Sequence, residues 1–151
     1  CENAPLPGRE EYLDSEKYEI RPRPERSPGD IVDEITRLNA IRRAHPALQD
    51  HRKLRFYNAF DDRVLVYGRQ EGLGAEMVLV VVSLDPHAVV EAEFELPLWE
   101  WDLPDHASLA AVDLMRERSF LLTGKRQRLR LDPADLPFAI WRLAPPEVQT
   151  R

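Results

Sequence analysis

The amino-acid sequence predicts a mainly β protein in which an antiparallel β-sandwich follows one helix. Three observations predict this fold. After residue 54 the apolar residues alternate with a period of two, as they do along half-buried strands. The β-branched and aromatic runs there are short and evenly spaced, with turn residues such as Asp85-Pro86 and Thr123-Gly124 between them. Between residues 31 and 44, by contrast, apolar residues recur at steps of three and four.

The first 28 residues are too polar to form a core by themselves. They hold five of the thirteen prolines, twelve charged residues and only seven apolar ones. Because proline fixes φ and lacks an N–H group, the run from Arg21 to Pro24 cannot be helical in its middle. The segment is therefore either a disordered tail or an ordered loop whose partner surface lies in residues outside this chain.

One amphipathic helix is expected from Ile31 to about Ala44. Asp30 is its expected N-cap, Arg42 and Arg43 suit the negative end of the helix dipole, and Pro46 stops it. The apolar side chains share one face, which we expect to lie on an apolar surface: Ile31, Ile35, Leu38 and Ile41.

Short strands are expected throughout the remainder of the chain. Their β-branched and aromatic runs are bounded by Gly, Pro, Asn and Asp, which favour turns. They are placed near residues 54–60, 64–67, 77–82, 88–96, 109–115, 118–122, 128–131 and 138–143.

Composition narrows the function classes. The 151 residues include 21 basic and 27 acidic side chains, a net charge of −6, so nucleic acid and anionic membrane surfaces are not expected as partners. No run of about eighteen apolar residues predicts a membrane span. A single cysteine and the lack of a basic-then-apolar leader favour a cytoplasmic protein, and the absence of an initiator Met before Cys1 suggests a piece of a longer one.

Motifs for metal, nucleophilic or cofactor chemistry are not found. The four histidines, at positions 45, 51, 87 and 106, have no compact ligand spacing, so no metal site is expected. There is no G-x-S-x-G elbow, and the glycines form neither a phosphate loop nor a dinucleotide fingerprint. No cofactor is therefore predicted.

Two surface features leave alternatives open. Trp99 and Trp101 would share a face if they lay on one strand and could then stack on sugar rings, but packing at a strand end beside Pro97 and Pro104 is the favoured interpretation. Residues 116–130 contain six basic residues and one acid. This run is most simply a solvated strand face, with contact to an anionic partner as the alternative.

Residues 10–18 read EEYLDSEKY, between Cys1-Glu2-Asn3 and Arg21-Pro22-Arg23. This stretch strongly resembles the bacterial α-1,4-glucan:maltose-1-phosphate maltosyltransferases, which are members of the α-amylase superfamily of glycoside hydrolase family 13 type. ITRLN, IRR and PAL within residues 35–48 agree with that family, as does VVVSLDPH at residues 80–87. The resemblance covers nearly the whole chain and is weakest from 98 to 130.

The resemblance implies a domain organisation and a reaction. Residues 1–50 would be the loop after strand 8 and the eighth helix of a (β/α)8 catalytic barrel, and residues 51–151 an all-β C-terminal domain. The implied reaction transfers a maltosyl unit from α-maltose 1-phosphate to an α-1,4-glucan with retention, in glycogen or α-glucan biosynthesis. The family's catalytic carboxylates lie on earlier barrel strands, so no catalytic residue is assigned in this chain. The resemblance also implies a homodimer, because related enzymes form homodimers.

Two residues match the family's donor-binding side chains, Lys17 and Tyr18. An ammonium group offers three hydrogen-bond donors to sugar oxygens, and tyrosine offers a hydroxyl on a rigid ring. Without the resemblance, Lys17 would more simply pair with Asp14 while Tyr18 packs. The sequence departs from the family after Arg21-Pro22-Arg23. The family usually has an acidic residue and a tryptophan there, whereas this chain has Pro24-Glu25.

Two other function classes remain open from the sequence. The sandwich could be a free-standing carbohydrate-binding module that uses Trp99 and Trp101. The chain could also be the C-terminal part of another hydrolase or isomerase of the α-amylase superfamily, because the helix and the sandwich are shared across it.

Overall fold

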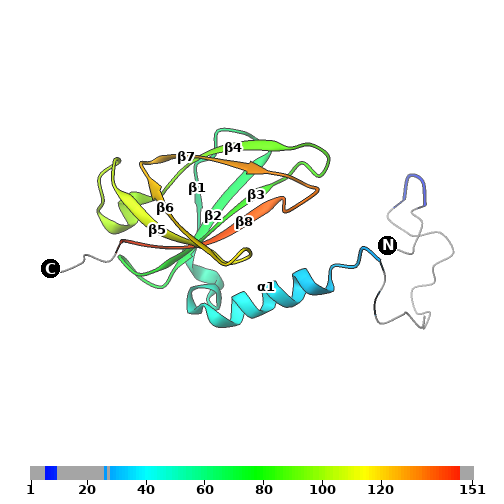
Figure 1. Ribbon diagram of the computed structural model, residues 1–151, viewed down its shortest axis with the longest axis horizontal. Helices are drawn as coiled ribbons and strands as arrows, with labels where there is room; N and C mark the ends of the chain where they lie inside the picture. The colour runs from blue at the N-terminus through cyan, green and yellow to red at the C-terminus, as the bar shows by residue number, and fades with distance from the viewer. Residues whose placement is uncertain (1–5, 10–25, 27, 147–151) are drawn as a thin grey trace. The chain divides into compact units, whose positions relative to one another are not determined.

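A computed structural model describes residues 6–9, 26 and 28–146 (Figure 1). Its helical elements are the α-helix α1 (Val32–Ala44) and three short 3-10 helices, η1 (Pro46–Leu48), η2 (His51–Lys53) and η3 (Leu98–Trp101). Its strands are β1 (Leu54–Tyr57), β2 (Val64–Gln70), β3 (Met77–Ser83), β4 (Val90–Glu95), β5 (Ser108–Asp113), β6 (Arg118–Thr123), β7 (Arg126–Leu131) and β8 (Phe138–Ala144).

The strands form two antiparallel sheets, which confirms the mainly β sandwich. Six strands pair in the order β1-β2-β3-β8-β5-β6, and β4 pairs with β7 in a second sheet. The buried core draws on β2, β3, β5, β6 and β8 of the larger sheet and on β4 and β7 of the smaller one. In Figure 1 the β4–β7 ribbon lies across the larger sheet. The core is therefore the layer between the two sheets.

Strand β3 lies inside the larger sheet, between β2 and β8. Met77, Leu79 and Val81 are fully buried in the core, and Val78 on the opposite face is also fully buried. η1 packs against β2 and β3. Burial of both faces explains why this strand reads as a continuous apolar run rather than an alternating one.

The expected strands are all present, with shifted ends. β1 ends at Tyr57 because the chain then crosses to the smaller sheet: Ala59 bridges Phe94, and the Phe60 amide donates to the Glu93 carbonyl oxygen over 2.9 Å. β2 continues to Gln70, paired with Met77 of β3. This extension was hidden in the sequence because residues 68–70 are Gly, Arg and Gln, which break the apolar pattern.

Helix α1 begins one residue later than expected, at Val32, whose amide donates to Asp30 Oδ1 over 3.0 Å. Asp30 thus caps the helix as predicted. Ile41 is buried, whereas Ile31 and Ile35 are exposed, and the apolar surface expected to cover this face stays a prediction. The chain divides into two compact units within this helix, Cys1–Leu38 and Asn39–Arg151, and only the second contains the sheets.

Candidate functional site

The predicted donor-binding pair, Lys17 and Tyr18, lies outside the residues that the structure describes. Their contact with substrate stays a prediction. The described residues offer three other places where polar or aromatic side chains gather: a groove between β6 and β7, the surroundings of η3, and a turn at one end of the larger sheet.

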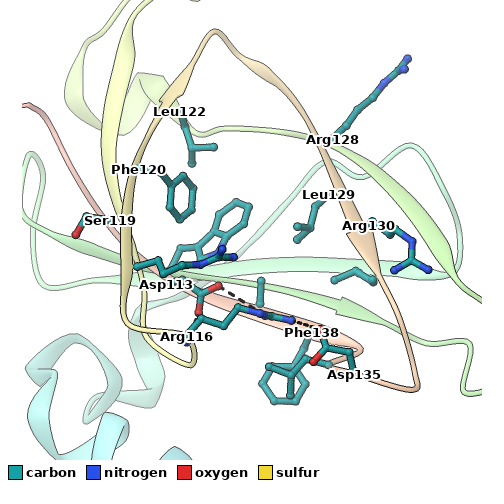
Figure 2. Close-up of a pocket in the computed structure, with 15 residues that line it drawn as sticks. Asp113, Arg116, Ser119, Phe120, Leu122, Arg128, Leu129, Arg130, Asp135 and Phe138 are labelled. Atoms are coloured by element: carbon teal, nitrogen blue, oxygen red, sulfur yellow. Dashed lines mark hydrogen bonds and ion pairs between the residues drawn. The ribbon is translucent and has the colours of Figure 1, made fainter.

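The groove has a volume of about 600 Å³ and opens where the two sheets diverge (Figure 2). Only Gly124 and Lys125 separate β6 from β7, yet β6 pairs with β5 while β7 pairs with β4. Figure 2 shows Phe120 and Leu122 on one side and Leu129 on the other. Because two consecutive strands belong to different sheets, an opening is left between them.

The floor of the groove is aromatic and holds one unpaired polar atom. Trp141 of β8 lines the groove, is 5% exposed, and its ring packs edge-on against Phe120 with centroids 5.3 Å apart. Its Nε1 is buried and finds no hydrogen-bond partner among the described residues. Buried N–H groups without a partner are rare in folded proteins.

Arginines and two carboxylates surround this floor. Arg116 binds Asp135 at 2.5 Å and lies 3.7 Å from Asp113, which is itself buried. Arg130 binds Asp132 at 2.8 Å. Arg118 lines the groove and has no ion pair with a described residue. The groove thus presents both hydrogen-bond donors and acceptors.

The basic run in this region is largely neutralised across the smaller sheet. Strand pairing places Glu91, Glu93 and Glu95 opposite the arginines of β7, which are Arg130, Arg128 and Arg126. Arg126 and Arg128 both bind Glu93, at 2.9 and 3.2 Å. These three arginines are exposed, so the solvated strand face expected for residues 116–130 is confirmed for the part that lies on β7.

Trp99 and Trp101 lie on η3 and not on one strand, so they do not share a strand face. Trp101 packs against the core, and its Nε1 donates to the Ala75 carbonyl oxygen over 2.9 Å. Trp99 is 46% exposed and packs edge-on against Tyr57, with centroids 6.0 Å apart. Because Trp101 packs against the core and Trp99 packs against Tyr57, the structure supports the packing interpretation rather than a paired sugar platform.

Between these tryptophans lies a buried carboxylate that sequence reasoning missed. Glu100 is 5% exposed, and both its oxygens accept from Arg55 Nη1, at 2.7 and 2.6 Å. The Tyr57 hydroxyl donates to the same carboxylate over 3.2 Å. Burial, followed by the charge of Glu100, raises the pKa of Tyr57 well above its usual range. No local pattern marks Glu100 as buried, because its partners come from β1, more than forty residues earlier.

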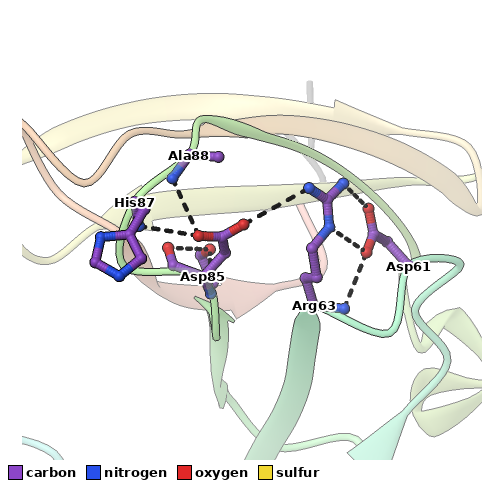
Figure 3. Close-up of polar contacts among 6 residues, drawn as sticks. Asp61, Arg63, Asp85, His87 and Ala88 are labelled. Carbon is purple, nitrogen blue, oxygen red and sulfur yellow. Dashed lines mark hydrogen bonds and ion pairs between the residues drawn. The ribbon is translucent and has the colours of Figure 1, made fainter.

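The third cluster joins the loop before β2 to the loop after β3 (Figure 3). Arg63 binds Asp61 at 2.7 Å and lies 3.8 Å from Asp85. Hydrogen bonds from Arg63 hold the pKa of Asp61 at about 2. Asp85 Oδ1 accepts from the backbone amides of His87 and Ala88, and these bonds lower the pKa of Asp85. The cluster fixes turn geometry and leaves no carboxylate poised for proton transfer.

Among residues 6–9, 26 and 28–146, no group of three or more His, Cys, Asp or Glu side chains could hold a metal ion. No helix in that part of the chain is long and apolar enough to cross a membrane.

Comparison with known proteins places this fold in a family. A family model described as "GLGE, C-terminal" matches residues 56–143, which is more than half of the chain. The chain belongs to this family. The matched residues of the GLGE C-terminal chain begin within β1 and end within β8, so the match covers both sheets and the groove between β6 and β7.

Relatives of this GLGE C-terminal chain share most of its length. The α-1,4-glucan:maltose-1-phosphate maltosyltransferase of Pseudomonas aeruginosa is 56% identical over 143 residues, which are 95% of this chain and 22% of that protein. The enzyme of the same name from Cereibacter sphaeroides is 49% identical over 146 residues, 97% of this chain and 22% of that protein. The chain therefore spans about a fifth of the length of the curated relatives it matches. The family resemblance expected from EEYLDSEKY is confirmed.

Proposed function

We propose that this chain is the C-terminal part of a retaining glycosyltransferase that transfers maltosyl from α-maltose 1-phosphate to α-1,4-glucan in α-glucan biosynthesis. The observation that carries the proposal is the 56% identity over 143 residues to a protein named for that activity. Transfer with retention requires a carboxylate nucleophile and an acid–base carboxyl group about 5 Å apart. We assign neither role to a residue of this chain, so the chemistry belongs to the preceding part of the enzyme.

The role proposed for this chain is to complete the donor site and to brace the barrel. Lys17 and Tyr18 would bind hydroxyl groups of the donor's maltosyl unit, as the match to the family motif implies. Residues 1–50 would then close the catalytic barrel, and residues 51–151 would form the C-terminal domain.

Exposed apolar side chains support the bracing role. Ile31 is 62% and Ile35 48% exposed in the unit Cys1–Leu38, and Phe56 is 65% exposed in the unit Asn39–Arg151. Covering such side chains contributes about 25 cal/mol per Å² of apolar surface removed from water. We propose that the barrel covers them.

Phosphate release from α-maltose 1-phosphate in the presence of a glucan acceptor tests this function. The enzyme that includes the barrel should release phosphate, and residues 1–151 alone should not, because the catalytic carboxylates are assigned to the barrel. Release by the isolated chain, or hydrolysis without transfer by the longer enzyme, would contradict the proposal.

Two further properties belong to the whole enzyme. We propose that it is a homodimer, as the family resemblance implies, and that it is cytoplasmic, which the single cysteine of this chain supports. Sedimentation at several protein concentrations tests the dimer, and fractionation of the producing cells tests the compartment. A monomer at micromolar concentration, or recovery outside the cytoplasmic fraction, would reject the respective statement.

A further inference from the structure

We propose that the groove between β6 and β7 is a docking site for an extended, acidic segment of a partner protein, which adds to the free edge of β7 as a further strand. The site is built from strand edges and arginine side chains, and none of its residues is assigned to the donor site. It is therefore independent of the proposed enzymatic function.

The strands on either side of the groove each have one edge that pairs with no described strand. β6 is the last strand of the larger sheet, and β7 is paired with β4 alone in the smaller sheet. The other edge of the smaller sheet is closed, because Ala59 bridges Phe94 of β4. An open edge presents backbone N–H and C=O groups with which an extended peptide can pair. The groove side of β7 is thus a place where a strand can be added.

Strand β4 shows which kind of segment suits β7. Its sequence, VEAEFE, alternates apolar and acidic residues, and the apolar ones are fully buried in the core. Pairing sets its three glutamates opposite the three arginines of β7: Glu91 opposite Arg130, Glu93 opposite Arg128, and Glu95 opposite Arg126. A strand of the same pattern on the free edge of β7 would place carboxylates beside these arginines and apolar side chains over the groove floor.

The arginines of the groove have hydrogen-bond donors left for such a segment. Arg118 of β6 lines the groove, is exposed and has no ion pair with a described residue. A guanidinium carries five N–H donors, so Arg128 can bind a second carboxylate besides Glu93, and Arg130 a second one besides Asp132. A basic segment would be repelled by the same three arginines.

The floor of the groove suits the apolar and backbone groups of a strand. Phe120 is 37% exposed, and Figure 2 shows Leu129 across the groove from it, so an apolar side chain can enter between them. Trp141 lines the groove, and its buried Nε1 donates to no described residue. An oxygen of the added segment would supply the missing acceptor.

The acidic strand of a second copy of this chain is not free to enter the groove. β4 is already paired with β7 along one edge and is bridged by Ala59 on the other. The remaining strands do not share its alternation of glutamate with apolar residues. A segment of another protein is therefore the occupant that the groove fits.

A peptide with the sequence of residues 89–96, VVEAEFEL, is the probe for this site. Titrated into ¹⁵N-labelled residues 1–151, it should shift the amide signals of β6 and β7 and the indole signal of Trp141 saturably, and slow hydrogen exchange at β7 amides. The same peptide with its three glutamates replaced by lysine is the control and should not bind.

Three results of this titration would overturn the proposal. The first is no binding of the acidic peptide at millimolar concentration. The second is a set of shifts confined to β1, which is the other edge of the larger sheet. The third is faster hydrogen exchange at β4 amides, because the peptide would then have replaced β4 instead of joining the free edge of β7.

Arg118→Glu tests the role of charge. Because Arg118 makes no ion pair with a described residue, its replacement should leave thermal unfolding unchanged, and we expect the peptide to bind about tenfold more weakly. Arg42→Glu makes the same change of charge at an exposed position of α1 and should bind as the parent chain does. Equal affinities of the two variants would reject the site, since both would then act only through net charge.

Other occupants of the groove are distinguished with the same variants. Sedimentation of residues 1–151 that shows self-association weakened by Arg118→Glu would assign the groove to a second copy and overturn the proposal. The enzyme that includes the barrel should bind the peptide as tightly as residues 1–151 do, because the occupant is a separate protein. Loss of binding in that enzyme, with β7 amides already slow to exchange, would assign the groove to a segment of the enzyme itself and would also overturn the proposal.

Discussion

At the scale of single residues, the described polar side chains mostly serve the fold. Glu100 is held by Arg55 and Tyr57, and Asp61 by Arg63. Trp141 is different, because its buried N–H has no described partner. Two predictions concern single residues. One is for Lys17 in the proposed donor site, and the other is for Asp61 in the turn beside Arg63.

Replacing Lys17 by Ala in the enzyme that includes the barrel should raise the KM for α-maltose 1-phosphate or lower kcat/KM about tenfold or more, because a charge-assisted hydrogen bond to the donor is lost. Steady-state phosphate release measures this. Lys53→Ala is the control, since the Lys53 ammonium donates to the Glu71 carbonyl oxygen on the sandwich. Unchanged donor kinetics for Lys17→Ala would remove Lys17 from the donor site.

Replacing Asp61 by Asn should destabilise the chain at neutral pH but not near pH 2. Hydrogen bonds from Arg63 hold the folded pKa of Asp61 at about 2, below its value of about 3.9 in an unfolded chain. The carboxylate therefore contributes its full stabilisation above about pH 4, and the contribution is lost as the pH falls toward 2. Thermal unfolding of Asp61→Asn and of the parent between pH 2 and 7 measures the difference.

Asp62→Asn is the matched control for that experiment. Asp62 is the exposed neighbour of Asp61 and makes no ion pair with a described residue. Its replacement should leave the Tm within a degree or two across the whole range. A Tm difference for Asp61→Asn that did not change with pH would show that the charge of Asp61 does not stabilise the turn.

At the scale of elements, the edge of the larger sheet depends on a close approach at Gly68 of β2. A Cβ at this position would lie 2.9 Å from Tyr57 Cε2 and 3.0 Å from Met77 Sδ. Tyr57 donates to Glu100 and Met77 is fully buried, so neither can move aside freely. Gly68 therefore lets β1, β2 and β3 pack on the core face of the sheet.

Gly68→Ala should cost about 1–3 kcal/mol of unfolding free energy, because the added methyl overpacks the core. Chemical denaturation measures the loss. Gly72→Ala is the matched control, since a Cβ there would meet nothing within 4 Å and its φ is not positive. That variant should stay within about 0.5 kcal/mol of the parent. Equal effects of the two substitutions would contradict the packing account.

At the scale of the whole molecule, two sheets of unequal size form the sandwich, and a groove opens at one of its edges. Six strands form one sheet and two form the other. β6 belongs to the larger sheet and β7 to the smaller one, and the chain passes between the sheets at Gly124. A two-residue connection ordinarily joins the strands of one hairpin. Here it carries the chain from one sheet to the other, and the groove is the consequence. Catalytic activity, in the proposal above, belongs to the longer enzyme.

The sequence by itself determined the strand positions, the cap at Asp30 and the family, because each depends on a local pattern: a period of two, turn residues, or a short motif such as EEYLDSEKY. Only the tertiary structure decided which strands share a sheet, that Glu100 is buried, and that Trp141 lines a groove with its N–H unpaired. The physical reason is that these features arise from contacts between residues distant in sequence, such as the pairing of β3 with β8. No local period specifies which partner a strand or a buried side chain will find.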